Sequence, residues 1–416
     1  MHGPTGDRRS LIPLLGTSTL YGLIAMMMTT VLAVHLDRLG ATAFYVGALY
    51  AASALAFLLF PPVWGAVSDV LRAPKRIMVV SLVLAAVLMP LFIVFDEPAG
   101  VVALRFVFVA FACGFVPAAL AQTSLIGGAR GRGAALGLLN ASMGLGRGTG
   151  QVLAGILLAW VSRSSTFLAM TALASVAIVL LLPFRPASVP PPGDERGSVL
   201  SEVRRRLFPR VSETAHLRRF GLIWLYVSFS IRDIMILGTF AMMPIYLLKD
   251  AGLSELHMGL LLAINPMSQV FFQVIFGRLS DSVGRKKLLA AGLLGSAMVP
   301  VLWSFATHPW VIGVGMVWVA LSYSSLASGT TAFIGDAAPP GREAELMGLH
   351  LTFRGIGGVV GPLVVGALSH PDALGFRVTF GAMSTLGFVA FLLVCFLTEE
   401  TLGRSSEAAG GAPDTP

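Results

Sequence analysis

The sequence contains few charged residues and very few cysteines. Only 12% of its 416 residues are charged and 56% are hydrophobic, which argues against a water-soluble globular protein. The two cysteines, Cys113 and Cys395, both fall inside apolar runs, so neither a disulfide framework nor a cysteine-based metal site is predicted. The seven histidines are scattered and no nucleophile motif occurs. We therefore predict neither a metal site, nor a cofactor, nor an enzyme.

Long apolar runs fill most of the chain. About 20 apolar residues in a helix cross the roughly 30 Å of hydrocarbon in a bilayer, and a helix satisfies its backbone hydrogen bonds internally. Such runs are predicted at 11 to 36, 42 to 66, 76 to 95, 98 to 124, 134 to 160, 164 to 184, 219 to 248, 253 to 277, 286 to 305, 309 to 335, 343 to 369 and 375 to 397. The predicted fold class is an all-α integral membrane protein with twelve transmembrane helices. No small-residue cleavage site closes the first run, so a cleavable signal peptide is not expected.

The basic residues between these runs lie mainly on one side of the predicted membrane. Twenty-one fall on that side, and the opposite side has only Arg38, Arg163, Lys249 and Arg377. By the positive-inside rule, both termini and the long central connection are cytoplasmic. We expect a multi-pass protein of the cell membrane, inner or plasma, in contact with the lipid bilayer. The net charge of +8 follows from this topology and does not indicate a nucleic-acid partner.

Glycines and acids recur in the two halves of the chain. At an offset of 212 positions, Gly65 and Asp69 match Gly277 and Asp281. Two pseudo-symmetric six-helix halves of like orientation explain this, and such halves place a substrate site near the membrane midplane. The predicted parts are a cytoplasmic N-terminus 1–10, halves 11–184 and 219–397, a cytoplasmic linker 185–218 and a disordered tail 398–416. The linker forms either a solvated tether or a short amphipathic helix on the inner membrane surface.

Two polar stretches in equivalent connections carry a common motif. Residues Gly277 to Lys287 read Gly-Arg-Leu-Ser-Asp-Ser-Val-Gly-Arg-Lys-Lys, and the stretch from Gly65 to Arg76 shares the glycine and the acid. Both resemble the signature of the major facilitator superfamily that lies between spans two and three and between spans eight and nine. This resemblance covers almost the whole chain, and it implies the twelve-helix fold and secondary active transport by alternating access. The gating residues that it implies are Gly65, Asp69, Arg72, Lys75, Arg76, Gly277, Asp281, Gly284, Arg285, Lys286 and Lys287.

Each copy of this motif is expected to act as a latch. Its carboxylate can accept hydrogen bonds from a helix N-terminus or pair with an arginine in one state of a transport cycle and not in the other. The alternative is that these residues only fix the geometry of the connections.

Glycines repeat inside the fifth and eleventh predicted spans. Small residues at this spacing allow tight helix crossings, and a proline adds a kink. The residues predicted to serve helix packing are Gly146, Gly150, Gly357, Gly361 and Pro362. The Gly-x-x-x-Gly-Pro pattern resembles one associated with the drug and proton antiporters of the superfamily. In those proteins it lies in span five, whereas here span five has Gln151 in place of the proline.

Ionisable side chains inside the predicted spans are the clearest indication of a functional site, because each is costly in hydrocarbon. We expect Asp233 to be the protonatable group, alternately paired with an arginine and released; a static interhelical ion pair is the alternative. Arg105 resembles the span-four arginine of a second superfamily motif, which is linked to proton coupling. Arg232 and Asp233 point about 100° apart on a helix, so their main partners are expected on other helices.

Polar residues at helical spacing are expected to line a central cavity. They are Asn140, Arg147, Gln151, Arg232, Asn265, Gln269, Gln273, His350 and Arg354. The predicted function is proton-coupled efflux of small hydrophobic or amphipathic compounds by a monomeric antiporter. Four arginines within spans against one deep aspartate favour an alternative, a carrier of organic anions by exchange or symport. An integral-membrane enzyme and a transport-silent sensor on the same fold stay as remote alternatives.

Overall fold

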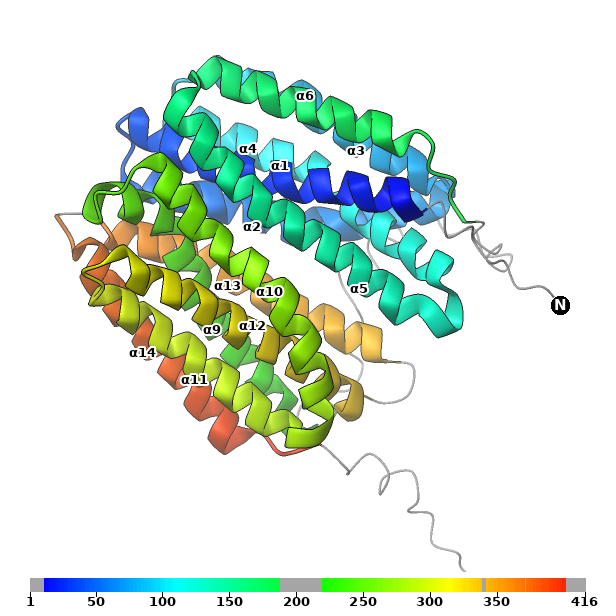
Figure 1. Ribbon diagram of the computed structural model, residues 1–416. Coiled ribbons are helices and arrows are strands. Elements are labelled where there is room, and N and C mark those ends of the chain that lie inside the picture. Colours follow the sequence, from blue (N-terminus) through cyan, green and yellow to red (C-terminus); the bar gives the residue numbers. More distant parts are fainter. Residues whose placement is uncertain (1–10, 188–218, 339–341, 371, 402–416) are drawn as a thin grey trace, which may run out of the picture. The chain divides into compact units, whose positions relative to one another are not determined.

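The computed structural model describes residues 11–187, 219–338, 342–370 and 372–401 of the chain, and these form helices joined by short connections (Figure 1). Among these residues, 11 helical segments are long and apolar enough to cross a membrane. The chain divides into two compact units. The first unit comprises Met1–Arg210 and Pro244–Met267, and the second comprises Val211–Met243 and Ser268–Pro416.

The first unit contains six long helices. They are α1 (Leu11–Arg38), α2 (Ala43–Leu71), α3 (Pro74–Leu88) with the 3₁₀ turn η2 (Met89–Ile93), α4 (Pro98–Ala112), α5 (Phe115–Trp160) and α6 (Arg163–Leu181). Proline is the first residue of α3 and of α4, where the missing N–H has no intrahelical partner in any case. Before α6, the Ser162 hydroxyl accepts a hydrogen bond from the Ser165 N–H, which caps that helix.

Helix α5 is two helices joined at a break. Gly128 has φ 60° and ψ −176°, a conformation that favours glycine, so the helical path is interrupted there. The residues before it continue α4 into one apolar segment, Pro98–Gly128. Those after it contain the predicted span 134–160, which is less apolar because it holds Arg147 and repeated glycines. With this part counted as a crossing helix, the twelve-helix class predicted from the sequence is confirmed.

The second unit is built mainly from the later helices. They are η3 (Arg219–Gly221), α9 (Leu222–Ile245), α10 (Glu255–Val283), α11 (Arg285–Ser304), α12 (Pro309–Ala337), α13 (Glu343–Leu368) and α14 (Gly375–Leu397). Near the end of α9, Pro244 is followed by one π-helical turn, η4 (Tyr246–Asp250). This turn and the first part of α10 belong to the first unit. One border between the compact units, after Arg210, lies within the predicted linker 185–218, whereas Pro244–Met267 of the second predicted half belongs to the first unit.

Close backbone contact joins α1 to α5. A Cβ atom on Gly146 or Gly150 would overlap the carbonyl oxygen of Thr19 or Leu23, and one on Gly22 would overlap that of Met143. Only glycine permits this approach, and the two helices cross with their backbones in contact. The glycine repeat of the sequence thus lies at a helix crossing inside the first unit.

An equivalent crossing joins α9 to α13 in the second unit. A Cβ atom on Gly357 would lie 2.5 Å from the Ser230 carbonyl oxygen and 3.0 Å from Cβ of Asp233. On Gly361 it would overlap the Ile234 carbonyl oxygen, and Pro362 follows inside the same helix. The close crossing therefore places the backbone of α13 directly beside Asp233.

The residues that follow α14 are packed, although the sequence predicts a disordered tail from residue 398. Thr398 and Thr401 are buried, and the Glu399 N–H donates to the Phe220 carbonyl oxygen at 3.0 Å. The backbone returns to the start of α9, and these contacts order it to Thr401. The rest of the tail, the N-terminal residues 1–10 and linker residues 188–218 lie outside the described part.

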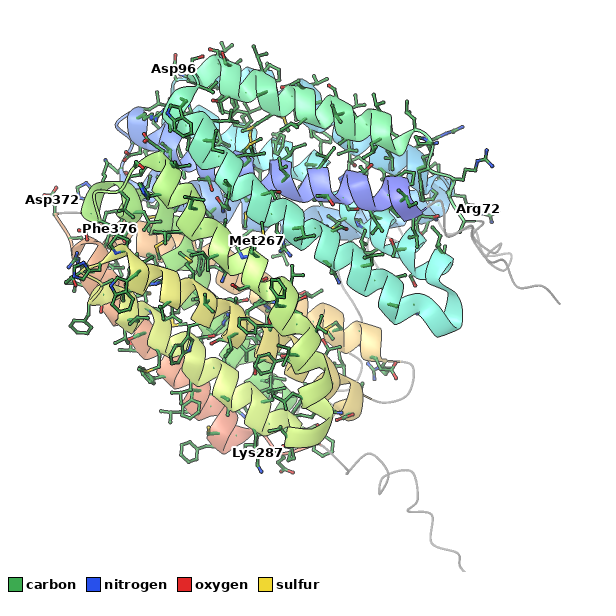
Figure 2. All side chains as sticks on the ribbon, in the orientation of Figure 1. Arg72, Asp96, Met267, Lys287, Asp372 and Phe376 are labelled. Atoms are coloured by element: carbon green, nitrogen blue, oxygen red, sulfur yellow. The ribbon has the colours of Figure 1, made fainter. Side chains whose placement is uncertain are left out.

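The connections gather at the two ends of each unit. Figure 2 shows Arg72 and Asp96 at opposite ends of the first unit, and Lys287 and Asp372 at opposite ends of the second. This arrangement follows from helices that all run from one end of a unit to the other.

Candidate functional site

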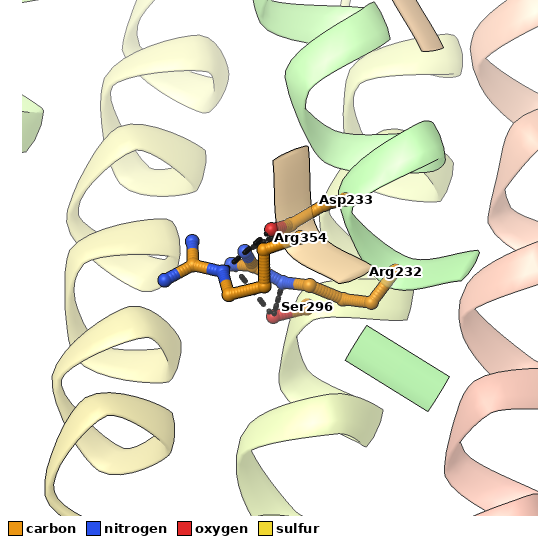
Figure 3. Close-up of polar contacts among 4 residues, drawn as sticks. All are labelled: Arg232, Asp233, Ser296 and Arg354. Atoms are coloured by element: carbon orange, nitrogen blue, oxygen red, sulfur yellow. Dashed lines mark hydrogen bonds and ion pairs between the residues drawn. The ribbon is translucent and has the colours of Figure 1, made fainter. Parts of the chain in front are cut away.

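Asp233 on α9 lies at the centre of a buried ionic cluster in the second unit (Figure 3). Its side chain is fully buried, and its two oxygens accept from different arginines. Arg232 Nη1 donates to Oδ1 at 2.6 Å, and Arg354 Nε on α13 donates to Oδ2 at 2.7 Å. Arg232 also donates to the Ser296 hydroxyl on α11, through Nε at 3.4 Å and Nη2 at 3.5 Å. The cluster thus ties three helices together.

The pairing of Arg232 with Asp233 differs from the expectation drawn from helical geometry. Adjacent side chains leave a helix about 100° apart, which favours partners on other helices. This holds for the Arg354 contact but is wrong for Arg232, which binds its own neighbour as well as Ser296. The arginine side chain is long enough to curve back to the next residue, and no other carboxylate is described beside it.

One carboxylate therefore serves two guanidinium groups. Charges in a low-dielectric interior interact strongly, and an uncompensated one is costly, so Asp233 stabilises both arginines while it is ionised. A proton on Asp233 would remove the negative charge and weaken the link between α9 and α13. The arrangement can act as a proton-sensitive clamp between two helices.

A cavity of about 150 Å³ lies beside this cluster in the second unit. Arg232, Tyr323, His350 and Arg354 line it, and the Arg354 side chain is 25% exposed there. The guanidinium carbon of Arg354 lies 5.9 Å from the centre of the Tyr323 ring, a cation–π contact. His350 is buried and its Nδ1 has no hydrogen-bond partner among the described residues. The cavity combines positive charge, an imidazole and an aromatic wall.

A second buried arginine, Arg105 on α4, is held by hydroxyl groups in the first unit. Its Nε donates to Ser53 Oγ on α2 at 2.9 Å, and its Nη2 donates to Thr29 Oγ1 on α1 at 2.7 Å. Its guanidinium carbon lies 5.5 Å from the centre of the Phe108 ring. Nη1 is buried and has no partner in the described part of the chain. The resemblance assigns Arg105 to proton coupling, and that role stays a prediction.

The other residues predicted to line a cavity lie in varied surroundings. Gln151 is buried, and its Oε1 accepts from Thr30 Oγ1 at 2.6 Å across the α1–α5 contact. Asn140 is exposed, and Arg147 is half-buried with no partner for Nε among the described residues. On α10, Asn265 is buried, whereas Gln269 and Gln273 are half-buried.

The second copy of the gating motif contacts the segment that follows α14. Gly284 has φ 101° and precedes α11, whose first two N–H groups donate to the Glu400 carboxylate: Arg285 at 2.8 Å and Lys286 at 3.1 Å. Arg285 Nε also donates to Asp336 Oδ2 on α12 at 3.2 Å. The sequence did not indicate Glu400 or Asp336, because both are distant from the motif along the chain. For Asp281 and Gly277 the structure describes only the helical backbone, so the surroundings of the Asp281 carboxylate lie outside the described part.

The first copy of the motif has a different geometry. Arg72, with φ 48°, ends α2, and its N–H donates to the Asp69 carbonyl oxygen at 3.4 Å. Lys75 Nζ donates to the carbonyl oxygen of Leu182 at the end of α6 at 2.6 Å. Gly65 is buried within α2, and Arg76 is exposed. The first copy thus connects α3 to α6 inside the first unit, and its gating role stays a prediction.

Comparison with protein families decides the class of the molecule. The model described as Major Facilitator Superfamily matches residues 14–264 and 225–415, which together cover nearly the whole chain. The chain belongs to the Major Facilitator Superfamily. It is therefore a multi-pass membrane transporter of small molecules, and the family membership predicted from the gating motif is confirmed.

Relatives within the superfamily are similar at moderate identity. The tetracycline resistance protein, class H, of Pasteurella multocida is 31% identical over 158 residues, 38% of each chain. The multi-drug resistance efflux pump PmrA of Streptococcus pneumoniae is 25% identical over 345 residues, 82% of this chain and 83% of that one. The crystal structure of nucleoside transporter NupG aligns with a TM-score of 0.77 at 12% identity, over 94% of this chain and 99% of that one. The last similarity concerns the fold alone.

Proposed function

We propose that this superfamily member exports small hydrophobic or amphipathic compounds in exchange for protons, by alternating access. The observation that carries the proposal is the buried Asp233, shared by Arg232 and Arg354 beside a cavity that contains aromatic and polar groups. The name of the PmrA relative, a multi-drug resistance efflux pump, supports the direction of transport, and both it and the tetracycline resistance relative support the substrate class. Both termini are proposed to be cytoplasmic, in the cell membrane, and the working form to be a monomer.

In this proposal Asp233 is the group that couples protons to transport. While it is ionised, its bonds to Arg354 hold α13 against α9 at the Gly357 crossing. Protonation removes one of the attractive charges and lets the two helices change their packing. Proton uptake from one side and release to the other would then drive the cycle in one direction. Arg105, the nine predicted cavity residues and the two motif copies keep their predicted roles as proposals.

The test is flux into proteoliposomes with an imposed pH gradient. A fluorescent hydrophobic dye is loaded, and its movement is followed with the gradient in each orientation. Export coupled to protons predicts dye movement opposite to the proton flow, and no accumulation when the gradient is collapsed. Asp233→Asn should abolish accumulation, and Asp372→Asn, at a residue whose side chain is 91% exposed, should not. Equal accumulation by the Asp233 variant would exclude this residue as the coupling group.

A carrier of organic anions is the second candidate, and Arg354 supports it because this arginine lines the cavity. An anion bound to Arg354 would compete with the Asp233 carboxylate. By linkage, its binding would favour protonation of Asp233, so anion and proton would move in the same direction. The same proteoliposomes therefore separate the two candidates through the sign of coupling. Movement of a small carboxylate with protons, and no effect on dyes, would favour this second candidate.

A further inference from the structure

A second cavity, of about 160 Å³, lies in the first unit, at the end where α1 and α5 finish and α6 begins. It is formed by one unit alone, at the same end as Asp96 and opposite to Arg72 (Figure 2). Its polar groups come from His35 and Arg38 near the end of α1 and from Arg163 and Thr166 in the first turn of α6. Neither the transport cycle proposed above nor the gating motif uses this cavity.

Two arginines meet at this cavity on a side of the protein that is poor in positive charge. Of the four basic residues predicted on the non-cytoplasmic side, Arg38 and Arg163 both line it. Each one donates to the end of a helix. Arg38 Nη2 donates to the Leu158 carbonyl oxygen at 3.2 Å, and Arg163 Nη2 donates to those of Phe92 and Ile93 at 2.9 Å. These backbone contacts fix both guanidinium groups beside the cavity.

Nitrogen atoms around the cavity are left over after these contacts; those of the arginines are donors, and Nε2 of His35 is a donor in the ring form that carries a proton there. Both described contacts of Arg38 use Nη2, since the one with Glu255 at 3.0 Å also uses that atom. Nε of Arg163 is buried and has no partner among the described residues. The same is true of Nε2 of His35, whose side chain lies on the cavity wall and is only 5% exposed. Buried polar atoms without partners are rare in proteins, and each requires an explanation such as a bound group.

The first turn of α6 adds a further attraction for negative charge. Helix N-termini present free N–H groups and a partial positive charge, and they bind phosphate in many proteins. The planar fork of arginine fits phosphate oxygens in the same way. The remaining wall is apolar and includes Leu158 and Phe167, which suits the carbon part of a phosphate ester.

We propose that this cavity is a binding site for a phosphate group, contacted by His35, Arg38 and Arg163 at the N-terminus of α6. The group is either the headgroup of a membrane phospholipid or a free phosphate ester or ion. Glu255 and Asp96 pair with Arg38 and Arg163 at 3.0 and 2.6 Å and balance their charges. The affinity is therefore modest and depends on the hydrogen-bond donors more than on net charge.

The test uses the purified full-length protein in a neutral detergent and measures binding through thermal unfolding. Inorganic phosphate is titrated at constant ionic strength in one arm, and a short-chain phosphatidylglycerol in the other. A bound ligand raises the Tm in proportion to its occupancy. The variants are His35→Phe, which keeps a ring beside Phe167 but has no polar nitrogen, and Arg38→Gln. The control is Arg377→Gln, which removes an arginine from the same predicted side but from the start of α14.

The lipid, or both the lipid and phosphate, should raise the Tm of the wild type and of the Arg377 variant. The apparent Kd should rise about tenfold or more in the His35 and Arg38 variants, because each loses a hydrogen bond to a charged group. A shift with the lipid alone identifies a headgroup site, and one with both ligands a general phosphate site. The absence of any shift, or equal shifts in all four proteins, would overturn the proposal. The Arg38 side chain is half-exposed, so its replacement should leave the protein folded. Ligand binding can then be measured on this variant even if the His35 variant is unstable. No outcome depends on transport.

Discussion

At the scale of single residues, Asp233 is a buried acid that pairs with two arginines in the second unit. Its side chain has no exposure to solvent. Replacing it by asparagine keeps the shape and removes the charge. Breaking a buried ion pair by removing one partner costs about 3–5 kcal/mol, because the remaining charge is left uncompensated. We expect Asp233→Asn to lower the thermal stability clearly as well as to uncouple transport.

The double variant Asp233→Asn with Arg354→Gln separates these two effects. Removal of one arginine together with the acid leaves a single guanidinium, which Ser296 still contacts through Arg232. Stability should therefore recover in part, whereas proton coupling should remain absent. Thermal unfolding and dye accumulation are measured on the same preparations. Recovery of coupling in the double variant would show that Asp233 does not carry the proton.

The sequence indicated which ionisable residues form this cluster, but it did not indicate how their side chains contact one another. Asp233 and both arginines stood out because ionisable groups in apolar runs need partners. The contact between Arg232 and Asp233 could not be deduced, since it depends on which way a flexible side chain curves. Ser296 carried no signal of its own, because serine is common inside apolar runs. The missing information is side-chain conformation, which sequence periodicity does not contain.

At the scale of helices, the contact between α9 and α13 depends on one glycine. A methyl group on Gly357 would lie 2.5 Å from the Ser230 carbonyl oxygen and 3.0 Å from Cβ of Asp233, so α13 would have to move. Overpacking of this kind costs about 1–3 kcal/mol. We expect Gly357→Ala to lower the Tm and to reduce proton-driven accumulation by shifting Arg354 from Asp233.

The same helix supplies a matched control for this prediction. Gly348 also lies in α13, and a Cβ atom placed there would meet nothing within 4 Å. Gly348→Ala should leave both the Tm and the accumulation near those of the wild type. A loss of equal size at both positions would mean that reduced backbone flexibility of α13, and not the close crossing, accounts for the effect, because alanine favours the helix more than glycine does.

Helix α11 is held at its start by a residue from the far end of the chain. The Glu400 carboxylate accepts from the N–H groups of Arg285 and Lys286, which have no intrahelical partners. Removal of such a cap costs about 1 kcal/mol. We expect Glu400→Ala to lower the free energy of unfolding by that amount and to loosen the second motif copy. Glu97→Ala is the control, since Glu97 precedes α4 and is exposed but its side chain makes no cap hydrogen bond.

The positions of the helices and the glycine-rich crossings could be predicted from the sequence. Contacts between residues far apart in the sequence could not. Apolar runs set the helices, and the glycine repeats marked the α1–α5 and α9–α13 crossings, because both patterns are local. The cap on α11 depends on the chain returning past Asp336, which no local pattern encodes. The break at Gly128 lies in the connection predicted between the runs 98 to 124 and 134 to 160, but the sequence does not show which glycine there takes a positive φ.

At the scale of the whole molecule, the distribution of charge predicts which ends of the helices face the cytoplasm. The connections near Arg72 and Lys287 carry most of the described basic residues, and those near Asp96 and Asp372 carry few. The positive-inside rule then predicts that the gating motif lies inside and that the proposed phosphate cavity lies outside. Labelling of single cysteines tests this, after Cys113 and Cys395 are replaced by alanine.

In intact cells, a membrane-impermeant maleimide should label cysteines placed at Glu97 and Asp372 and should leave those at Arg72 and Lys287 unlabelled. All four side chains are exposed, so burial does not limit the reaction. After permeabilisation all four should react, which controls for expression. The reversed pattern would place the motif outside and would refute both the assigned orientation and the outer position of the phosphate cavity.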